Sequence, residues 1–195
     1  MIIGAIVLAA GRSQRMGRAK QTLPVGGQAM LARVVETILA AKLDQVVVVL
    51  GASAPEIAPL LAGLPVTVTY NPRWREGLSS SLRAGLAALP AGARAALFVP
   101  ADLPHLTART VRMIVDCFDR TGKGIVIPTC GGRRGNPVLF AHTHFVELLH
   151  LQGDQGGRAL FSGHKDDITF VETGDEGILL DVDTPDDYKR VTRQE

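Results

Sequence analysis

The sequence predicts an α/β fold, a doubly wound, mostly parallel open sheet within a single domain that spans residues 1–195. Two observations predict it. Apolar, β-branched runs alternate along the chain with segments whose apolar residues recur at helical spacing. Three of these runs have no polar side, which is typical of parallel strands covered on both faces. With 195 residues, 46% of them hydrophobic, the chain can bury one full core.

Strands and helices are expected to alternate up to residue 128. The expected strands lie at 2–8, 45–50, 66–70, 95–99 and 124–128, and the first, second and fourth are the ones without a polar side. Apolar stripes predict helices at 31–39, 78–89 and 107–118, the last of them capped by Thr107. Alternation of this kind requires right-handed crossovers between parallel strands, and these wind helices onto both faces of the sheet.

The pattern is less regular after Pro128. The expected elements are a Gly-rich turn at 131–137, a short strand at 138–140, a helix near 144–150, a strand at 168–171 and a last helix opened by Thr184 and Pro185. The sequence contains no internal repeat, low-complexity segment or interdomain linker. One domain therefore accounts for the whole pattern.

Composition excludes several classes of function. The net charge is +2, and no long basic block points to a nucleic-acid partner. The opening MIIGAIVLAA has no basic region before it and is too short to span a bilayer, so no membrane association is expected. Cys117 and Cys130 are too few for a disulfide framework and lack metal-ligand spacing. Both are expected to be reduced, in a cytoplasmic protein.

The loop LAAGRSQRMGRAK (8–20) follows the first strand, where parallel sheets bind ligands. It does not match a P-loop, because five residues separate Gly11 from Gly17, and it has too few glycines for a dinucleotide fingerprint. What is left is a glycine turn that exposes backbone N–H groups, followed by cations that could surround a triphosphate. These cations are Arg12, Arg15, Arg18 and Lys20. The alternative is a solvated basic turn.

The same stretch, read as L-A-A-G-x-S-x-R-M-G-x-x-K, resembles the signature of nucleotidyltransferases related to the molybdopterin-guanine-dinucleotide synthase. The likeness is strongest to the molybdenum cofactor cytidylyltransferases. It continues through NPRWREGLSSSLRAGL (71–86), PADLP (100–104), RRGNPVLF (133–140) and LLDVDTPDDY (179–188). The resemblance implies a Rossmann-like nucleotidyltransferase fold. It also implies Mg²⁺-dependent transfer of CMP from CTP to the phosphate of the molybdopterin cofactor, with release of pyrophosphate.

The resemblance also implies roles for individual residues. Gly11 lets the backbone approach the nucleotide, Arg15 and Lys20 contact the phosphates, and Asp102 acts with them in catalysis. The implied nucleotide-binding residues are Leu8, Ala9, Ala10, Gly11, Arg12, Ser13, Arg15, Lys20, Asn71, Ser79 and Asp102. Ala10 fits the cytidylyl branch, because guanylyl relatives usually carry a second glycine at that place and a pyrimidine needs less room.

Two aspartates are the implied metal ligands. Asp102 follows the fourth expected strand; by position alone it could instead cap a turn or the next helix. Mg²⁺ prefers carboxylate and phosphate oxygens, so the resemblance favours Asp102 together with Asp183 as its ligands, against an N-cap role for Asp183. Asp181 is interpreted as structural. Asp186 and Asp187 are expected in the first turn of the last helix.

The segment around 71–86 combines a turn signal at Asn71 with serines at a helix start. A helix N-terminus of this kind could bind an anionic or polyhydroxyl ligand. For Ser80 and Ser81 a capping role is favoured over ligand contact. Trp74, the only tryptophan, is expected to be a packing residue.

The turn RRGNP departs from the related pattern R-G-H-P, because Asn136 replaces the histidine. Asparagine still forms hydrogen bonds but cannot become cationic, which bears on the acceptor more than on the chemistry. The expected acceptor-binding residues are Arg134, Gly135, Asn136 and Pro137. For Arg133 and Arg134, a solvated position is an equal alternative. His142, His144 and His150 show no metal-ligand spacing and are interpreted as surface or helix residues.

Two other functions are compatible with these motifs. One is a different NTP transferase of the same superfamily, with a guanylyl, methylerythritol-phosphate or sugar-phosphate reaction. The other is a carrier that binds the molybdenum cofactor without chemistry; its protein partner would be a molybdoenzyme or its chaperone. Retention of the basic loop and of Asp102 favours the enzyme.

Overall fold

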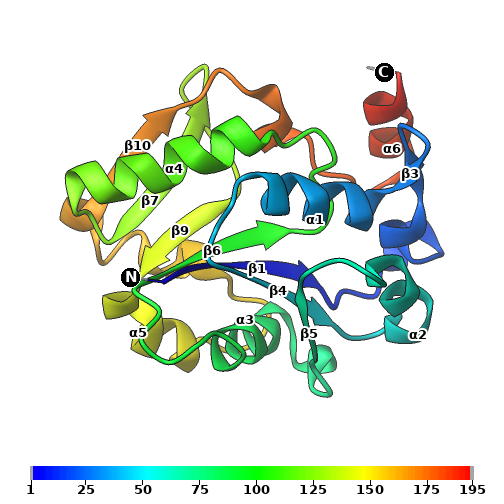
Figure 1. The fold of residues 1–195 in the computed structure, drawn as a ribbon, viewed down its shortest axis with the longest axis horizontal. Helices are drawn as coiled ribbons and strands as arrows, with labels where there is room; N and C mark the ends of the chain where they lie inside the picture. Colours follow the sequence, from blue (N-terminus) through cyan, green and yellow to red (C-terminus); the bar gives the residue numbers. More distant parts are fainter. Residues whose placement is uncertain (1, 194–195) are drawn as a thin grey trace.

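A mixed sheet of eight strands forms the centre of the computed structural model, which describes residues 2–193 (Figure 1). The strand order is β10-β7-β9-β6-β1-β4-β5, with β8 paired to β7. The strands are β1 (Ile3–Ala9), β4 (Gln45–Leu50), β5 (Thr67–Tyr70), β6 (Ala95–Pro100), β7 (Ile125–Cys130), β8 (Arg133–Arg134), β9 (Val138–Ala141) and β10 (Ile168–Glu172). The expected doubly wound, mostly parallel sheet is confirmed.

Strand β1 lies at the middle of the parallel part. It pairs in parallel with β4 and with β6, and the registers place Leu8 beside Pro100 and Ala9 beside Leu50. The carboxyl ends of the three strands therefore meet at one edge of the sheet. Strand β9 is antiparallel to both of its neighbours, β6 and β7, because the chain turns back after β7 instead of crossing over.

Helices cover both faces of the sheet (Figure 1). On one face lie α1 (Met30–Ala40) and α4 (Ala108–Thr121), and on the other α3 (Leu78–Ala87) and α5 (Phe145–His150). Thr107 caps α4 as expected, since its hydroxyl accepts a hydrogen bond from the amide of Thr110. Shorter elements complete the chain. They are α2 (Ala54–Ile57) and 3-10 turns at Gln14–Met16, Lys20–Thr22, Ala58–Leu61, Trp74–Glu76, His142–His144, Gly157–Leu160, Lys165–Asp167 and Glu176–Leu179.

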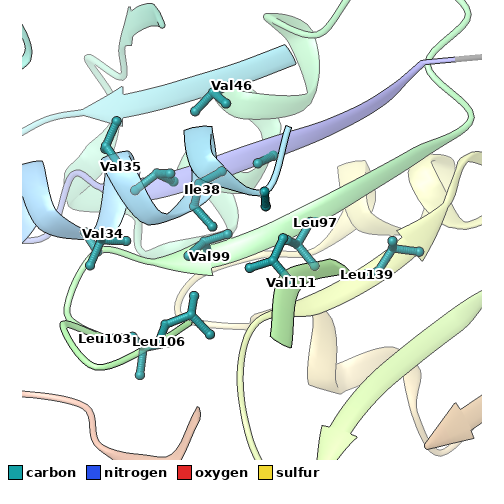
Figure 2. Packing of buried hydrophobic residues seen from close by; sticks show 14 of the residues in the cluster. Val34, Val35, Ile38, Val46, Leu97, Val99, Leu103, Leu106, Val111 and Leu139 are labelled. Carbon is teal, nitrogen blue, oxygen red and sulfur yellow. The ribbon is translucent and has the colours of Figure 1, made fainter. Parts of the chain in front are cut away.

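The larger part of the core lies between the sheet and helices α1 and α4. Figure 2 shows Ile38 of α1 beside Val99 of β6 and Val111 of α4 beside Leu97 of the same strand, with Val35 on α1 in the same cluster. All five side chains are fully buried. A second cluster, which includes Phe140 of β9, fills the space under α3 and α5. None of the described helices is both long enough and apolar enough to cross a membrane.

A third, smaller apolar cluster joins residues 23–30 to the C-terminal segment 182–191. It consists of Leu23, Val25, Met30, Val182 and Val191. The members come from the hairpin of β2 (Pro24–Val25) and β3 (Gln28–Ala29), from the start of α1, and from the segment that ends in α6 (Pro185–Thr192). Here the hydroxyl of Tyr188 donates a hydrogen bond to the Pro24 carbonyl at 2.6 Å. The sequence analysis did not predict this hairpin.

Helix α6 begins at Thr184 and Pro185 as expected, and a reciprocal capping box closes it. The Thr184 hydroxyl accepts from the Asp187 amide at 3.2 Å, and the Asp187 carboxylate accepts from the Thr184 amide at 2.9 Å. The hydrogen bond from the Thr184 hydroxyl is the largest of the effects that hold the pKa of Asp187 below its ordinary value. Asp187 is thus the first-turn residue that the sequence predicts.

Replacing Asp187 by asparagine is expected to lower the free energy of unfolding by about 1 kcal/mol near neutral pH, since the box loses its anionic acceptor. Because the folded state lowers the pKa of Asp187 from 3.8, this stabilisation is present above that pH and is lost as the pH falls below it. Urea unfolding of both chains near pH 7 and near pH 3 measures the difference. Asp186→Asn, on the exposed side of the same turn, is the control. A difference that persists undiminished in acid would contradict the assignment.

Candidate active site

The loop after β1 is closed by its own side chains. The Ser13 hydroxyl accepts a hydrogen bond from the amide of Lys20 at 3.2 Å. Gln21, only 2% exposed, donates from its side-chain amide to the Ala9 carbonyl at 3.4 Å. These two hydrogen bonds hold the loop in a defined turn. At Gly11, in the same loop, an added Cβ would meet no atom within 4 Å. Sequence reasoning missed Gln21, because a buried glutamine has no distinctive spacing.

The strand end that leads into this loop is tied to its neighbours. The Leu8 carbonyl accepts from the amide of Ala101, and the Ala10 carbonyl accepts from the amide of Ala52. Ala10 is buried, and a Cβ on Gly51 would lie 2.8 Å from the Ala10 methyl. Gly51 therefore makes room for the side chain of Ala10.

Lys20 joins two aspartates at the carboxyl edge of the sheet. Its Nζ lies 2.5 Å from Oδ2 of Asp102 and 2.8 Å from Oδ1 of Asp183. A guanidinium nitrogen of Arg15 lies 3.7 Å from the other oxygen of Asp183. The structure thus brings together four residues that the sequence analysis assigned to the site, from the β1 loop, the end of β6 and the segment before α6.

The charges of this cluster are strongly coupled. Burial lowers the pKa of Lys20, but the carboxylates of Asp102 and Asp183 outweigh it, so the pKa is raised and the lysine stays cationic. Burial raises the pKa of Asp102; Lys20 offsets part of this effect, while Asp181 and Asp183 add to it. Asp181, which the sequence analysis interpreted as structural, is exposed and adds negative charge to the same site.

The donor atoms suit a hard divalent cation. Within residues 2–193, Oδ1 of Asp102 is buried and has no hydrogen-bond partner. Carboxylate oxygens are the ligands that Mg²⁺ prefers. Since Lys20 bonds to both Asp102 and Asp183, a cation held by the same two carboxylates would take the place of its ammonium group.

Asp183 is positioned by the segment that precedes α6. The amide of Val182 donates to the Asp102 carbonyl at 3.1 Å, and the Val182 side chain is buried in the third cluster. Thr184, and not Asp183, is the N-cap of α6. The Asp183 carboxylate is therefore free of a capping role, and it faces Lys20.

The serine segment differs from expectation. Gly77 is the N-cap of α3, and no side chain caps this helix, so the capping role expected for Ser80 and Ser81 is wrong. Their hydroxyls instead accept hydrogen bonds from the side-chain amide of Asn71, at 2.8 and 3.1 Å. Asn71 is 2% exposed and Ser79 0%. Nucleotide contact by these two residues is still a prediction.

The start of α3 is packed tightly against a distant segment. Gly77 has a φ of 96°, and the amide of Ser79 donates to the Gly153 carbonyl at 3.1 Å. Trp74 packs against the second core cluster, as expected, and the Arg75 guanidinium lies 4.4 Å from the centre of its ring. Sequence reasoning missed the contact between Gly77 and Gly153, because nothing local marks it.

The expected acceptor turn lies beside the segment that carries Asp183. The Asn136 amide donates to the Ile178 carbonyl at 3.0 Å, and a Cβ on Gly135 would lie 2.6 Å from that carbonyl oxygen. Pro137 follows directly and leads into β9. Arg134 is exposed, and its guanidinium lies 5.0 Å from the centre of the Phe170 ring on β10. Acceptor binding by this turn is still a prediction.

The histidines after β9 are only partly as expected. His142 and His150 are exposed, whereas His144 ends the 3-10 turn before α5 as a buried residue, so for this histidine the helix alternative is correct and the surface alternative is wrong. Its side chain is 4% exposed and lies 2.9 Å from the Asp167 carboxylate. An aspartate 23 positions away can pair with the ring only through the fold, so no local pattern shows this burial.

Known proteins of similar sequence cover almost the whole chain. The family model of the MobA-like NTP transferase domain matches residues 5–168. The purine catabolism protein PucB of Bacillus subtilis is 30% identical over 96% of this chain and 95% of its own length. The molybdenum cofactor cytidylyltransferase of Escherichia coli is 30% identical over 95% of this chain and 93% of its own length.

A solved structure is also similar to this chain over almost its whole length. Rv0371c of Mycobacterium tuberculosis H37Rv superposes with a TM-score of 0.90 at 30% identity, over 99% of this chain and 98% of that one. A second structure of Rv0371c, in complex with manganese, has a TM-score of 0.86 at 29% identity and covers 100% of both chains. The resemblance drawn from the loop after β1 is therefore confirmed, and the chain belongs to the MobA-like NTP transferase domain family of nucleotidyltransferases.

Proposed function

We propose that this chain is an Mg²⁺-dependent cytidylyltransferase, which moves CMP from CTP to the terminal phosphate of the molybdopterin cofactor and releases pyrophosphate. The observation that carries the proposal is the pairing of Lys20 with Asp102 and Asp183 at the carboxyl edge of the sheet. Family membership supports the reaction class, and the likeness to the cytidylyltransferase of Escherichia coli supports the substrates.

In this reaction an oxygen of the acceptor phosphate forms a bond to the α-phosphorus, while the bond from that phosphorus to the β-phosphate oxygen breaks. The protein supplies alignment and charge, with no covalent intermediate. Asp102 and Asp183 would hold Mg²⁺, which supplies charge neutralisation for the reacting phosphates when it is bound. Lys20, released from the carboxylates, and Arg15, 75% exposed beside Asp183, then neutralise the triphosphate.

Two further features support the choice of cytosine as the base and the position of the acceptor. The Ala10 methyl lies against Gly51, at a position where guanylyl relatives usually carry a glycine. The methyl reduces the space for the nucleotide base, and a smaller space favours a pyrimidine over a purine. The turn of Gly135 and Asn136 bonds to Ile178, five residues before Asp183, so an acceptor held there lies next to the segment that completes the site. Asn136 recognises the acceptor by neutral hydrogen bonds.

A thermal-shift titration with CTP, GTP, ATP and UTP, each with and without Mg²⁺, tests the nucleotide. A ligand that binds only the folded state adds about 2.7 kcal/mol of stability at one hundred times its Kd. We expect the largest Mg²⁺-dependent shift with CTP and a reduced shift in Lys20→Met. Arg120→Gln is the control, because Arg120 is exposed on α4, outside this loop. A larger shift with GTP or ATP would contradict the cytidylyl assignment and indicate another NTP transferase.

Pyrophosphate release with CTP and the molybdopterin cofactor then tests the acceptor. The expected result is release that requires both compounds and Mg²⁺. Retention of the cofactor without pyrophosphate release, under conditions where CTP binds, would overturn the enzymatic assignment in favour of a carrier.

A further inference from the structure

A second group of polar side chains lies at the opposite edge of the sheet from Lys20. Strand β9 runs antiparallel to its neighbours, so the chain leaves its end at the edge where the parallel strands β7 and β10 begin. His144 and Glu147 follow β9, and His164 and Asp167 directly precede β10. Figure 1 shows this edge beside α5, with α2 and α6 at the far side of the molecule.

The hydrogen bond to Asp167 fixes the tautomer of His144. Asp167 also accepts a hydrogen bond from the Gly124 amide, at 2.8 Å. A carboxylate only accepts hydrogen bonds, so Nε2 of His144, 2.9 Å away, must carry the proton. In the neutral ring Nδ1 then carries a lone pair. Within residues 2–193 this buried nitrogen has no hydrogen-bond partner.

The unpartnered nitrogen faces further lone-pair donors. Nδ1 of His144 lies 3.9 Å from one carboxylate oxygen of Glu147, and Nε2 of His164 lies 2.8 Å from the other. The three residues can offer one ligand atom each within 4.8 Å of one another. The lone pair on Nδ1 of His144 and the Glu147 carboxylate are both electron-rich, and no described residue places a hydrogen-bond donor between them. A cation bound between them would stabilise this arrangement.

We propose that His144, Glu147 and His164 bind a Zn²⁺ ion through two imidazole nitrogens and one carboxylate oxygen. In a tetrahedral zinc site with ligand distances near 2.0 Å, neighbouring ligand atoms lie about 3.3 Å apart. One ligand atom from each residue lies within 4.8 Å of the other two, and a shared ion would replace the hydrogen bond between His164 and Glu147. Water completes the fourth position, since Glu147 and His164 reach the surface.

Asp167 is the positioning residue of this site. Metal-binding histidines commonly donate their second N–H to a carboxylate, which orients the ring. Gly124 accommodates the arrangement, because its amide donates to Asp167 at 2.8 Å and a Cβ there would clash with both Asp167 and the His144 ring. The zinc would tie α5 to the irregular segment 151–167.

Zinc binding to the full chain, stripped with a chelator and then titrated with ZnCl₂ against a chromophoric zinc indicator, tests the proposal. The expected result is one tightly bound zinc per chain. His164→Ala and Glu147→Gln should weaken it more than 100-fold, because each removes a ligand, and Asp167→Asn by about 10- to 100-fold. Far-ultraviolet circular dichroism confirms that each variant is folded.

Two control variants separate this site from others. His142→Ala removes an exposed histidine two positions from His144, and Asp183→Asn disables the carboxylate cluster at the other edge; both should keep the zinc. Loss of zinc in Asp183→Asn, or wild-type affinity in His164→Ala, would overturn the proposal. So would the absence of stoichiometric zinc in the wild type.

Discussion

Asp102→Asn is expected to lower the rate of nucleotidyl transfer by roughly 10³-fold while the protein stays folded. The substitution removes a negative charge and replaces one of the two carboxylates that bond to Lys20. Because burial raises the pKa of Asp102, ionising this side chain inside the protein already costs free energy, and a neutral amide does not incur that cost. Lys20 keeps Asp183 as its partner.

Steady-state pyrophosphate release with CTP and the molybdopterin cofactor measures this effect, and urea unfolding checks the fold. Asp186→Asn is the matched control, because Asp186 is exposed on α6 three positions beyond Asp183 and lies outside the cluster. The expected pattern is a loss of kcat in Asp102→Asn alone. Turnover within a few fold of wild type in that variant would remove Asp102 from the chemistry.

Gly77→Ala is expected to destabilise the fold by about 3 kcal/mol or more. Gly77 has φ 96° and ψ −175°, a backbone conformation that is essentially restricted to glycine. A Cβ there would clash with the Gly153 carbonyl and lie 2.7 Å from the amide nitrogen of Asp154. These are backbone atoms, which cannot rotate away as the end of a side chain can.

A second glycine separates the two contributions. Gly92 also has a positive φ, 85°, but a Cβ there would meet no atom within 4 Å, so Gly92→Ala reports a positive-φ substitution that has no clash. Its expected loss is about 1–2 kcal/mol. Urea unfolding of the two variants gives the comparison. Equal losses would mean that the approach of Gly153 to Gly77 contributes nothing.

The elements that were predicted well are those whose signal is local. Strands β1, β4 and β6 are continuous apolar runs, and the structure buries them on both faces as such runs require. Thr107 caps α4, and Thr184 with Pro185 opens α6. The direction of β9 was not predicted, because four apolar residues have the same pattern in a parallel and in an antiparallel strand.

The β2–β3 hairpin was missed although it has a local signal. Gly26 and Gly27 both have positive φ, as a two-residue hairpin turn requires, but the flanking strands contain only two residues each. Strands this short have no periodicity to recognise. The hairpin matters for the site, since it belongs to the cluster that fastens the segment of Asp183 to the rest of the fold.

In the site, position after the first strand indicated the basic loop, and the family resemblance implied Asp102 and Asp183. Their mutual contacts could not be predicted in the same way. Lys20 was expected to contact phosphate, and the structure pairs it with both aspartates. The effect of Asp181 on the pKa of Asp102 and the pairing of buried His144 with Asp167 likewise join residues that lie far apart in the chain. The spacing of residues in the sequence does not reveal such contacts.

The link between Lys20 and Asp183 spans 163 positions of the chain, and this separation has a consequence for the order of folding. Loop-closure entropy grows slowly with length, by about 0.6 kcal/mol per doubling, but contacts between distant segments form late. The chain up to the end of β6 and the residues that follow it already contain Lys20 and Asp102, a pair with no net charge. Docking of residues 180–183 then adds two carboxylates. The candidate site is therefore expected to be completed in one of the last steps of folding.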